Sequence, residues 1–263
     1  MRNQDEEPLN EWDLPEEPES DEEDPEAAHI ALTKEMYYTA IIENIYNEDT
    51  EKRREAIDLI CHFECDPRLE EPLMKLVRST DARFVLSGIV GLGNWRHTDG
   101  AEVLIEMINH PTPGVLWDME MLQEALIALG RIGGQEPLAF LKTYAHQRYH
   151  DHDGGEDTLG MAAIEAITEI ATHGQHGAVE FLIEGCRSLA WNMREACADS
   201  FSVVYAGKEQ LPKNVYETLV TLTKDENKNV RIAAYMSLDD IVGLDEKNKQ
   251  ILADARHKQV FGK

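Results

Sequence analysis

The 263-residue sequence has few aromatic residues, few basic residues and no long apolar run. Aromatic residues make up 7% of the chain, so its apolar content comes largely from Ala, Leu and Ile, which suit closely packed helices. No apolar run approaches the roughly 18 residues that a membrane-spanning helix needs. The first residues are charged where a signal peptide would be apolar. We therefore expect a cytoplasmic protein without a membrane-spanning segment.

The shortage of basic residues leaves a large negative charge. Asp and Glu number 51 against 25 Lys and Arg, which gives a formal net charge of -26. A chain this acidic repels nucleic acid and anionic membrane surfaces, so we expect neither as a partner. It attracts a basic protein partner. The alternative is that an acidic surface serves solubility alone.

Motifs that would indicate catalysis or cofactor binding are also absent. The sequence has no nucleophile elbow and no glycine-rich phosphate loop. Two groups of residues could hold a metal ion: the His and Asp residues of a predicted loop at 146–157, and Cys61 with Cys65. However, a loop preorganises ligands poorly, and free cysteines such as these, Cys186 and Cys197 are usually buried and reduced. We predict no catalytic residue, metal or cofactor, with a metal-dependent enzyme or lyase as an alternative.

Residues 1–28 differ from the rest of the chain. They hold 13 acidic residues and one basic residue, and four prolines interrupt them. Such a segment cannot bury enough apolar surface to offset the entropy of ordering, so we predict a disordered acidic tail. Trp12 lies between Leu9 and Leu14 and is a candidate anchor for a partner. The alternative is that these three residues are merely tolerated in a tail.

From residue 29 onward, apolar residues recur at three- and four-residue spacing, which predicts helices. Six segments share a small residue, usually a second small residue three positions later, and then a large apolar residue. Small residues three apart share one helical face and let a neighbouring helix approach closely. The first small residues, which are 32–38 positions apart, are Ala56, Gly88, Ala125, Ala163, Cys197 and Ala234.

A second helix is predicted after each of these segments, beyond a turn that contains Gly, Pro or Asp. One helix pair cannot bury its apolar face alone, whereas stacked pairs share a continuous core. We therefore predict one all-α domain over 29–259, an α-solenoid of about six helix pairs in which 29–48 forms an N-terminal capping helix. The predicted second helices are 70–79, 100–109, 136–145, 177–186, 214–223 and 247–256.

These repeats resemble the HEAT-repeat superfamily, in the short bacterial form called PBS-lyase HEAT-like repeats. The segments that match best are 229–234 (NVRIAA), 123–130 (QEALIALG) and the Asp-x-x-x-x-Val-Arg lead-in at Asp225. The resemblance covers residues 29–256. It implies a right-handed superhelix whose concave surface is lined by the second helix of each pair.

Proteins of that superfamily usually bind other proteins, while some bind DNA, some attach bilin pigments and one group hydroxylates deoxyhypusine. The hydroxylase resemblance needs paired His-Glu dipeptides, which this sequence does not contain. A DNA-binding groove would need rows of Lys and Arg. HEAT-like proteins of this size also resemble the antidotes encoded beside secreted bacterial toxins. We therefore predict a stoichiometric inhibitor or immunity protein that occludes a basic partner, with an adaptor that links two proteins as an alternative.

The predicted partner-binding residues are mainly acidic. The second helices carry two pairs of glutamates at i, i+4, a spacing of like charges that costs a helix a few tenths of a kcal/mol. A cost without a local reason suggests a partner that bears Lys or Arg, although an ordinary solvated face is the alternative. If the second helices line the concave surface, both pairs face it, and the lead-in to the third unit extends it. The predicted set is Trp12, Glu102, Glu106, Trp117, Asp118, Glu120, Glu180 and Glu184.

Overall fold

The computed structural model describes residues 25–63, 65–111, 118–150, 157–208 and 211–242, and within these ranges it contains helices and no strand. The chain forms two compact units, Met1–Thr39 and Ala40–Lys263. Across the ranges given above, no helix combines the length and the apolar character needed to cross a membrane.

Helix α1 spans Pro25–Asn44 and therefore crosses the border between the two units. It corresponds to the helix predicted at 29–48 but begins inside the range predicted as a tail, whose first 24 residues lie outside the described residues. Large apolar side chains of α1 are exposed, including Leu32 (61%) and Met36 (66%). The capping role of this helix stays a prediction.

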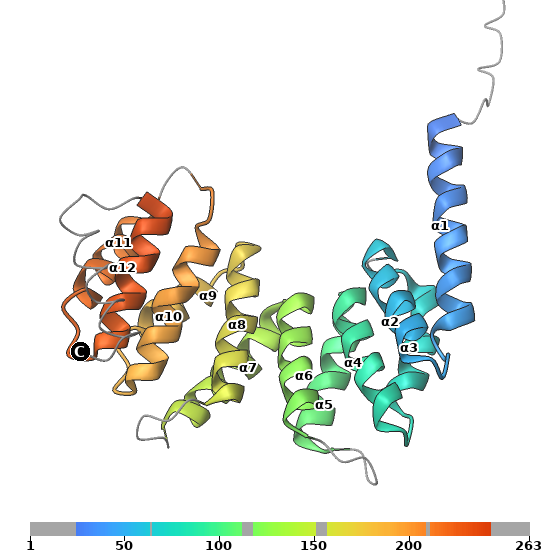
Figure 1. The fold of residues 1–263 in the computed structure, drawn as a ribbon, viewed down its shortest axis with the longest axis horizontal. Coiled ribbons are helices and arrows are strands. Elements are labelled where there is room, and N and C mark those ends of the chain that lie inside the picture. The colour runs from blue at the N-terminus through green and yellow to red at the C-terminus, as the bar shows by residue number, and fades with distance from the viewer. Residues whose placement is uncertain (1–24, 64, 112–117, 151–156, 209–210, 243–263) are drawn as a thin grey trace, which may run out of the picture. The chain divides into compact units, whose positions relative to one another are not determined.

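Every other predicted helix that falls within the described ranges is present, so the all-helical repeat fold is confirmed (Figure 1). The predicted helix at 247–256 lies outside those ranges. The first helices of the pairs are α2 (Thr50–Asp58, continued by the 3₁₀ helix η1, Leu59–Phe63), α4 (Ala82–Trp95), α6 (Met119–Ile132), α8 (Thr158–Thr172), α10 (Trp191–Val204) and α12 (Lys228–Val242). The second helices are α3 (Glu70–Val77, preceded by the 3₁₀ helix η2, Pro67–Leu69), α5 (Thr98–Asn109), α7 (Gln135–His150), α9 (Ala178–Gly185) and α11 (Lys213–Leu222).

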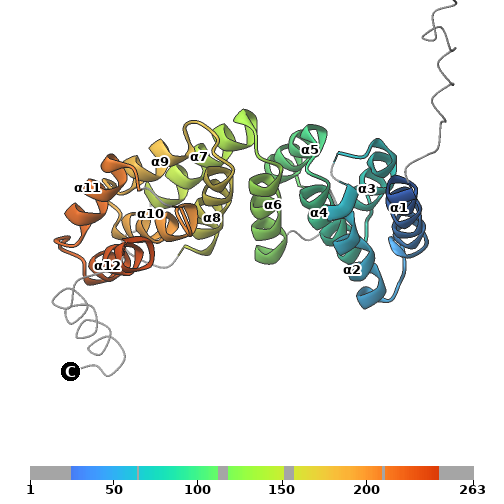
Figure 2. The same cartoon turned by 90° about the horizontal axis from the view of Figure 1, so that it is seen from above.

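Within the unit Ala40–Lys263 the helices form two layers. The first helices stack on one another in chain order, α2 on α4 and onward to α12, and the second helices form the other layer (Figures 1 and 2). The helices α3, α5, α7 and α11 each pack more extensively on the first helix that follows them than on the one before. In space, each of these four second helices therefore pairs mainly with the first helix of the next unit, whereas the sequence pattern pairs it with the first helix of its own unit.

Small residues bring the stacked first helices close together. A Cβ atom added to Gly93 on α4 would lie 2.9 Å from the Cα atom of Ala128 on α6, and one added to Gly130 on α6 would lie 2.6 Å from that of Ala166 on α8. In each contact, the residue five positions after the first small residue of one helix meets a residue of the next helix. That residue lies three positions after the first small residue of its own helix. The close approach predicted from the small residues is therefore confirmed.

This packing predicts opposite effects for two glycine-to-alanine substitutions in helices. Gly130→Ala should lower the free energy of unfolding by about 1–3 kcal/mol, because its methyl group meets the backbone of α8 and the stack must shift. The matched control Gly100→Ala on α5 meets no atom closer than 3.4 Å and should raise stability by up to about 1 kcal/mol through helix propensity. Urea denaturation of the two variants measures the difference. Equal effects would contradict the close contact at Gly130.

Buried or half-buried arginines hold the starts of three first helices. Arg53, Arg194 and Arg231 each lie three positions before the small residue of their helix. Each donates a hydrogen bond from Nη1 to the backbone carbonyl six residues earlier, so the loop that enters the helix is fixed to the helix. The accepting carbonyls belong to Asn47, Ser188 and Asp225, respectively.

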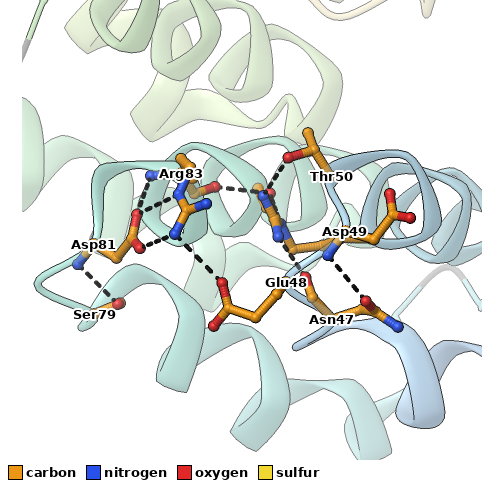
Figure 3. Close-up of polar contacts among 9 residues, drawn as sticks. Asn47, Glu48, Asp49, Thr50, Ser79, Asp81 and Arg83 are labelled. Atoms are coloured by element: carbon orange, nitrogen blue, oxygen red, sulfur yellow. Dashed lines mark hydrogen bonds and ion pairs between the residues drawn. The ribbon is translucent and has the colours of Figure 1, made fainter.

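Figure 3 shows the polar network around the first of these helix starts. Arg53 is 1% exposed; its Nε donates to Ser87 Oγ at 2.9 Å, and its guanidinium lies 4.6 Å from the ring centre of Phe84. Nearby, Asp81 caps α4 and pairs with Arg83 Nη2 at 2.6 Å. Hydrogen bonds from Arg83 hold the pKa of Asp81 at about 2. The network joins α2 to α4.

The cysteine prediction is wrong for two of the four residues. Cys61 and Cys65 are exposed, whereas Cys186 and Cys197 are buried as expected. The 3₁₀ helix ends at Phe63, and Cys65 has a left-handed backbone (φ 58°), so Cys61 and Cys65 are not one turn apart on an α-helix. Burial raises the pKa of the Cys186 thiol to about 12.

The predicted loop at 146–157 is wrong in its first part. Helix α7 continues to His150, because Arg148 anchors its last turn by donating from Nε to Asp157 Oδ2 at 2.8 Å. Asp157 also caps α8 by accepting from the Gly160 N–H. Residues 151–156 lie outside the described ranges, and within those ranges no three His, Cys, Asp or Glu side chains converge on a possible metal site.

Candidate functional site

A groove of about 760 Å³ runs along the stacked first helices. Eleven of the residues that line it recur at three positions, which lie two residues before, two after and six after the first small residue of a helix. Positions four apart share one face of a helix, so these side chains form three rows across the stack. The lining at these positions is Ile127 and Arg131 on α6, Met161, Glu165 and Glu169 on α8, Glu195, Asp199 and Val203 on α10, and Ile232, Met236 and Asp240 on α12.

The groove is strongly acidic at its centre. Five carboxylates line it against two guanidinium groups, and four of the five lie on the adjacent helices α8 and α10. On each of these helices the acids are one turn apart, which places like charges side by side. A cation that enters the groove can therefore approach several carboxylates at once. These four, called the central carboxylates from here on, are Glu165, Glu169, Glu195 and Asp199.

Apolar side chains surround the central carboxylates. Met161 and Val203 are 52% and 56% exposed, respectively, although both are large apolar residues. The hydroxyl groups of the groove are already engaged within the stack: Ser200 donates to the Ala196 carbonyl at 2.8 Å, and Ser237 donates to the Ala198 carbonyl at 2.8 Å. The groove therefore offers carboxylate acceptors and apolar surface to a partner.

Asp199 carries a perturbed carboxyl group in the groove. Its side chain reaches solvent, yet the walls of the groove surround it, and Asp240 on the next helix adds a like charge. Burial, and then repulsion from Asp240, raise the pKa of Asp199 to about 6. Glu165 and Glu169 on α8 and Glu195 on α10 line the same groove. Like charges from three neighbouring helices therefore line one groove.

Asp199→Asn should therefore raise the stability of the protein in a pH-dependent way. Below about pH 4 the carboxyl group is protonated in both the folded and the unfolded chain, and the substitution has no electrostatic effect. The folded pKa is raised, so ionisation of Asp199 costs the folded state more as the pH rises, and the full cost applies above about pH 6. Thermal unfolding from pH 4 to pH 8 should show a gain that grows and then levels off. A gain independent of pH would contradict this account.

Two arginines mark the opposite end of the groove. Arg96 follows α4 and has a left-handed backbone (φ 56°), a conformation that usually favours glycine. Arg131 donates from Nη1 to Asn94 Oδ1 at 3.4 Å. Within the described part of the chain, neither arginine has a carboxylate within ion-pair distance. The groove is thus cationic near α4 and α6 and anionic from α8 to α12.

The predicted glutamate pairs do not line this groove. Glu102 and Glu106 are exposed on α5, and Glu180 and Glu184 are exposed on α9, both in the layer of second helices. Glu180 also has a local role, because its carboxylate accepts from the Gly177 N–H at 2.8 Å at the start of α9. Hydrogen bonds from its own N–H and from that of Gly177 hold the pKa of Glu180 below its usual value.

The remaining predicted residues are also outside the groove lining. Asp118 caps α6 by accepting from the Met121 N–H at 3.0 Å, and Glu120 is exposed in the first turn of that helix. Trp12 and Trp117 lie outside the described residues. Within the described ranges, the two glutamate pairs therefore lie on second helices, as predicted, and Asp118 and Glu120 lie at the start of α6.

The central carboxylates were not among the predicted residues, because the family resemblance assigned the concave surface to the second helices. In this chain the groove lies on the helices that carry the small residues. A signal was present in the sequence, since Glu165 and Asp199 lie at the same repeat position as Ile127 and Met236, and Asp240 lies at the same repeat position as Val203. A comparison of open positions across the repeats would have found the acidic cluster.

Comparisons with known proteins add little to this description. No family model matches the chain, and no curated protein matches it. Among solved structures, an engineered protein is 19% identical with a TM-score of 0.39; the match covers 82% of this chain and 60% of that protein. A designed armadillo repeat protein in complex with the peptide (KR)4 is 14% identical with a TM-score of 0.39, covering 76% of this chain and 98% of that one. Computationally designed armadillo repeat proteins for modular peptide recognition give 15% identity, a TM-score of 0.36 and the same coverages.

Proposed function

We propose that this protein is a stoichiometric inhibitor that holds a basic protein partner in the groove along its first helices. The observation that carries the proposal is the cluster of central carboxylates on α8 and α10, of which Glu165 and Asp199 are exposed and which exposed apolar side chains border. An acidic cluster with an apolar border matches a protein surface that combines Lys or Arg with apolar residues.

The electrostatics of the chain support binding of a cation. The net charge of -26 steers a basic partner toward the protein from a distance, and this steering weakens as salt is added. In the groove, burial and then repulsion from Asp240 raise the pKa of Asp199, so a neighbouring cation would stabilise its ionised form. A bound Lys or Arg would supply that cation and would expel water from around the pair.

Occlusion is the proposed mechanism of inhibition. An enzyme that acts on an anionic substrate needs a basic active surface, and an acidic groove that covers this surface blocks access by substrate. We favour a secreted bacterial toxin, such as a nuclease, as the partner class, which makes this chain an immunity protein. The proposal needs no catalytic residue and no cofactor in this chain.

A pull-down from the native host at low salt, repeated at about 0.5 M salt to screen charge pairs, tests the proposal. The expected result is one basic partner, bound 1:1 at low salt and weakened at high salt, whose activity falls in proportion to the inhibitor added. Several partners without net positive charge would overturn the proposal and favour an adaptor. A basic partner that keeps its full activity when bound would contradict inhibition.

A further inference from the structure

The width of the groove suggests what kind of segment it accepts. The three rows of lining residues span eight positions of each first helix, for example from Met161 to Glu169 on α8. At 1.5 Å per residue this span is about 12 Å, which is close to the diameter of an α-helix with its side chains. A segment that runs along the stack therefore has room to lie across α6, α8, α10 and α12 as a helix.

Hydrogen bonding in the groove favours a helix over an extended strand. An extended segment presents unpaired N–H and C=O groups that need partners. The lining carboxylates can accept from the N–H groups of such a segment, but its carbonyls would find few donors. Apart from the two arginines and Asn229, the polar side chains are mainly carboxylates, and the Ser200, Ser202 and Ser237 hydroxyls already donate to helix carbonyls. A helix satisfies its own backbone and asks only for side-chain contacts.

The middle row of the groove has a defined order of chemistry. Along the stack it reads Ile127, Glu165, Asp199 and Met236, which is apolar, acidic, acidic and apolar. Stacked helices are about 8–10 Å apart, so a helix lying across them advances roughly five to seven residues from one to the next. At the upper end of that range the interval is nearly two helical turns, and one face of the occupant then meets all four positions.

We propose that the groove binds an amphipathic α-helix of the partner whose contact face reads apolar, basic, basic, apolar at intervals of six or seven residues. This inference rests on the proposed function and specifies the partner segment for the same site. The apolar residues contact Ile127 and Met236, and the two basic residues pair with Glu165 and Asp199. The flanking acids Glu169 and Glu195 add to the field at the two basic positions.

The unequal ends of the groove also set the direction of the helix. A helix carries partial positive charge at its N-terminus and partial negative charge at its C-terminus. Asp240 lies at the α12 end of the groove, while Arg96 and Arg131 lie at the other end. The N-terminus of the bound helix therefore lies over α12, and its C-terminus, together with any acidic residue there, lies toward Arg131.

Synthetic peptides of roughly 24 residues test this inference without knowledge of the partner. The first probe is a helix-forming peptide with Leu, Lys, Lys and Leu at intervals of seven and a Glu near its C-terminus. The second has the same composition with the Lys and Leu positions exchanged. The third is the first peptide with two central residues outside the contact positions replaced by proline. The prolines prevent a helix but leave the charge of the peptide unchanged. Binding is measured by calorimetry at low salt.

The first peptide is expected to bind at least about tenfold more tightly than either of the others, a difference of about 1.4 kcal/mol. Its affinity should fall at least tenfold in the double variant Glu165→Gln, Asp199→Asn and should be unchanged in the exposed control Glu102→Gln, Glu106→Gln. Equal binding of the helical and proline-containing peptides, or equal loss in the two protein variants, would overturn the helix inference. If no basic peptide binds in any conformation, the proposed function fails as well.

Discussion

Replacement of Arg194 by methionine is expected to lower the free energy of unfolding by about 3–5 kcal/mol. Its guanidinium pairs with Asp225 through two hydrogen bonds of 2.8 and 2.9 Å, and the two side chains are only 9% and 10% exposed. Nη1 also donates to the Ser188 and Leu189 carbonyls. Methionine fills similar space but leaves a nearly buried carboxylate and two carbonyls without these donors.

Urea denaturation measures this loss, with Arg187→Met as the matched control. Arg187 is exposed, so its substitution should change the stability by no more than about 0.5 kcal/mol. Arg194→Lys should recover only part of the loss, because an ammonium group cannot make the forked pair of hydrogen bonds. A loss below about 1 kcal/mol in Arg194→Met would show that this arginine does not hold the start of α10.

The same pair should contribute to acid sensitivity. Burial acts to raise the pKa of Asp225, but hydrogen bonds from Arg194 and from the Asn227 N–H outweigh it and hold that pKa below its usual value. A lowered folded pKa gives stability that is present above roughly pH 4, the unfolded value, and is lost as the pH falls through the folded value.

Neutralisation of the central carboxylates is expected to weaken binding of the basic partner by about 100-fold or more. The variant carries Glu165→Gln, Glu169→Gln, Glu195→Gln and Asp199→Asn. The variant removes like charges that lie one turn apart on α8 and α10, and circular dichroism checks that it folds. The loss should appear in both the association rate and the residence time, since steering and direct pairing both depend on these charges.

The matched control removes the same charge from the exposed face of the second helices. It carries four glutamate-to-glutamine substitutions that leave the cap of α9 intact, and it should weaken binding by less than about threefold. Equal losses in the two variants would mean that net charge alone drives binding. A larger loss in the control would support the second-helix surface. The control positions are Glu102, Glu106, Glu184 and Glu217.

The fold could be predicted because close packing leaves a direct mark on the sequence. Only small residues allow the separation seen between Gly130 and Ala166, so their recurrence identifies each first helix. Local backbone conformation could not be predicted in the same way, because nothing in the sequence around Cys65 indicates its left-handed backbone. The length of α7 was not predicted. Its last turn is held by a hydrogen bond from Arg148 to Asp157, which comes later in the sequence, after residues 151–156.

The acidic character of the candidate groove could be predicted from the sequence, but its position on the first helices could not. Composition predicts an acidic surface, and acidic side chains line the groove along the first helices. The sequence pairs α2 with α3, whereas in space α3 packs more extensively on α4, so the order along the chain does not identify the open layer. Glu180 was open to a local explanation, because a glutamate three residues after Gly177 suits a helix cap.

Site-specific photocrosslinking tests the position of the partner most directly. A photoreactive phenylalanine analogue replaces Met161, which is 52% exposed in the groove, or Tyr216, which is 46% exposed on α11 in the other layer. The partner should crosslink at position 161 in a 1:1 product that disappears at high salt, and it should not crosslink at position 216. Crosslinking at 216 without crosslinking at 161 would contradict a binding site along the first helices.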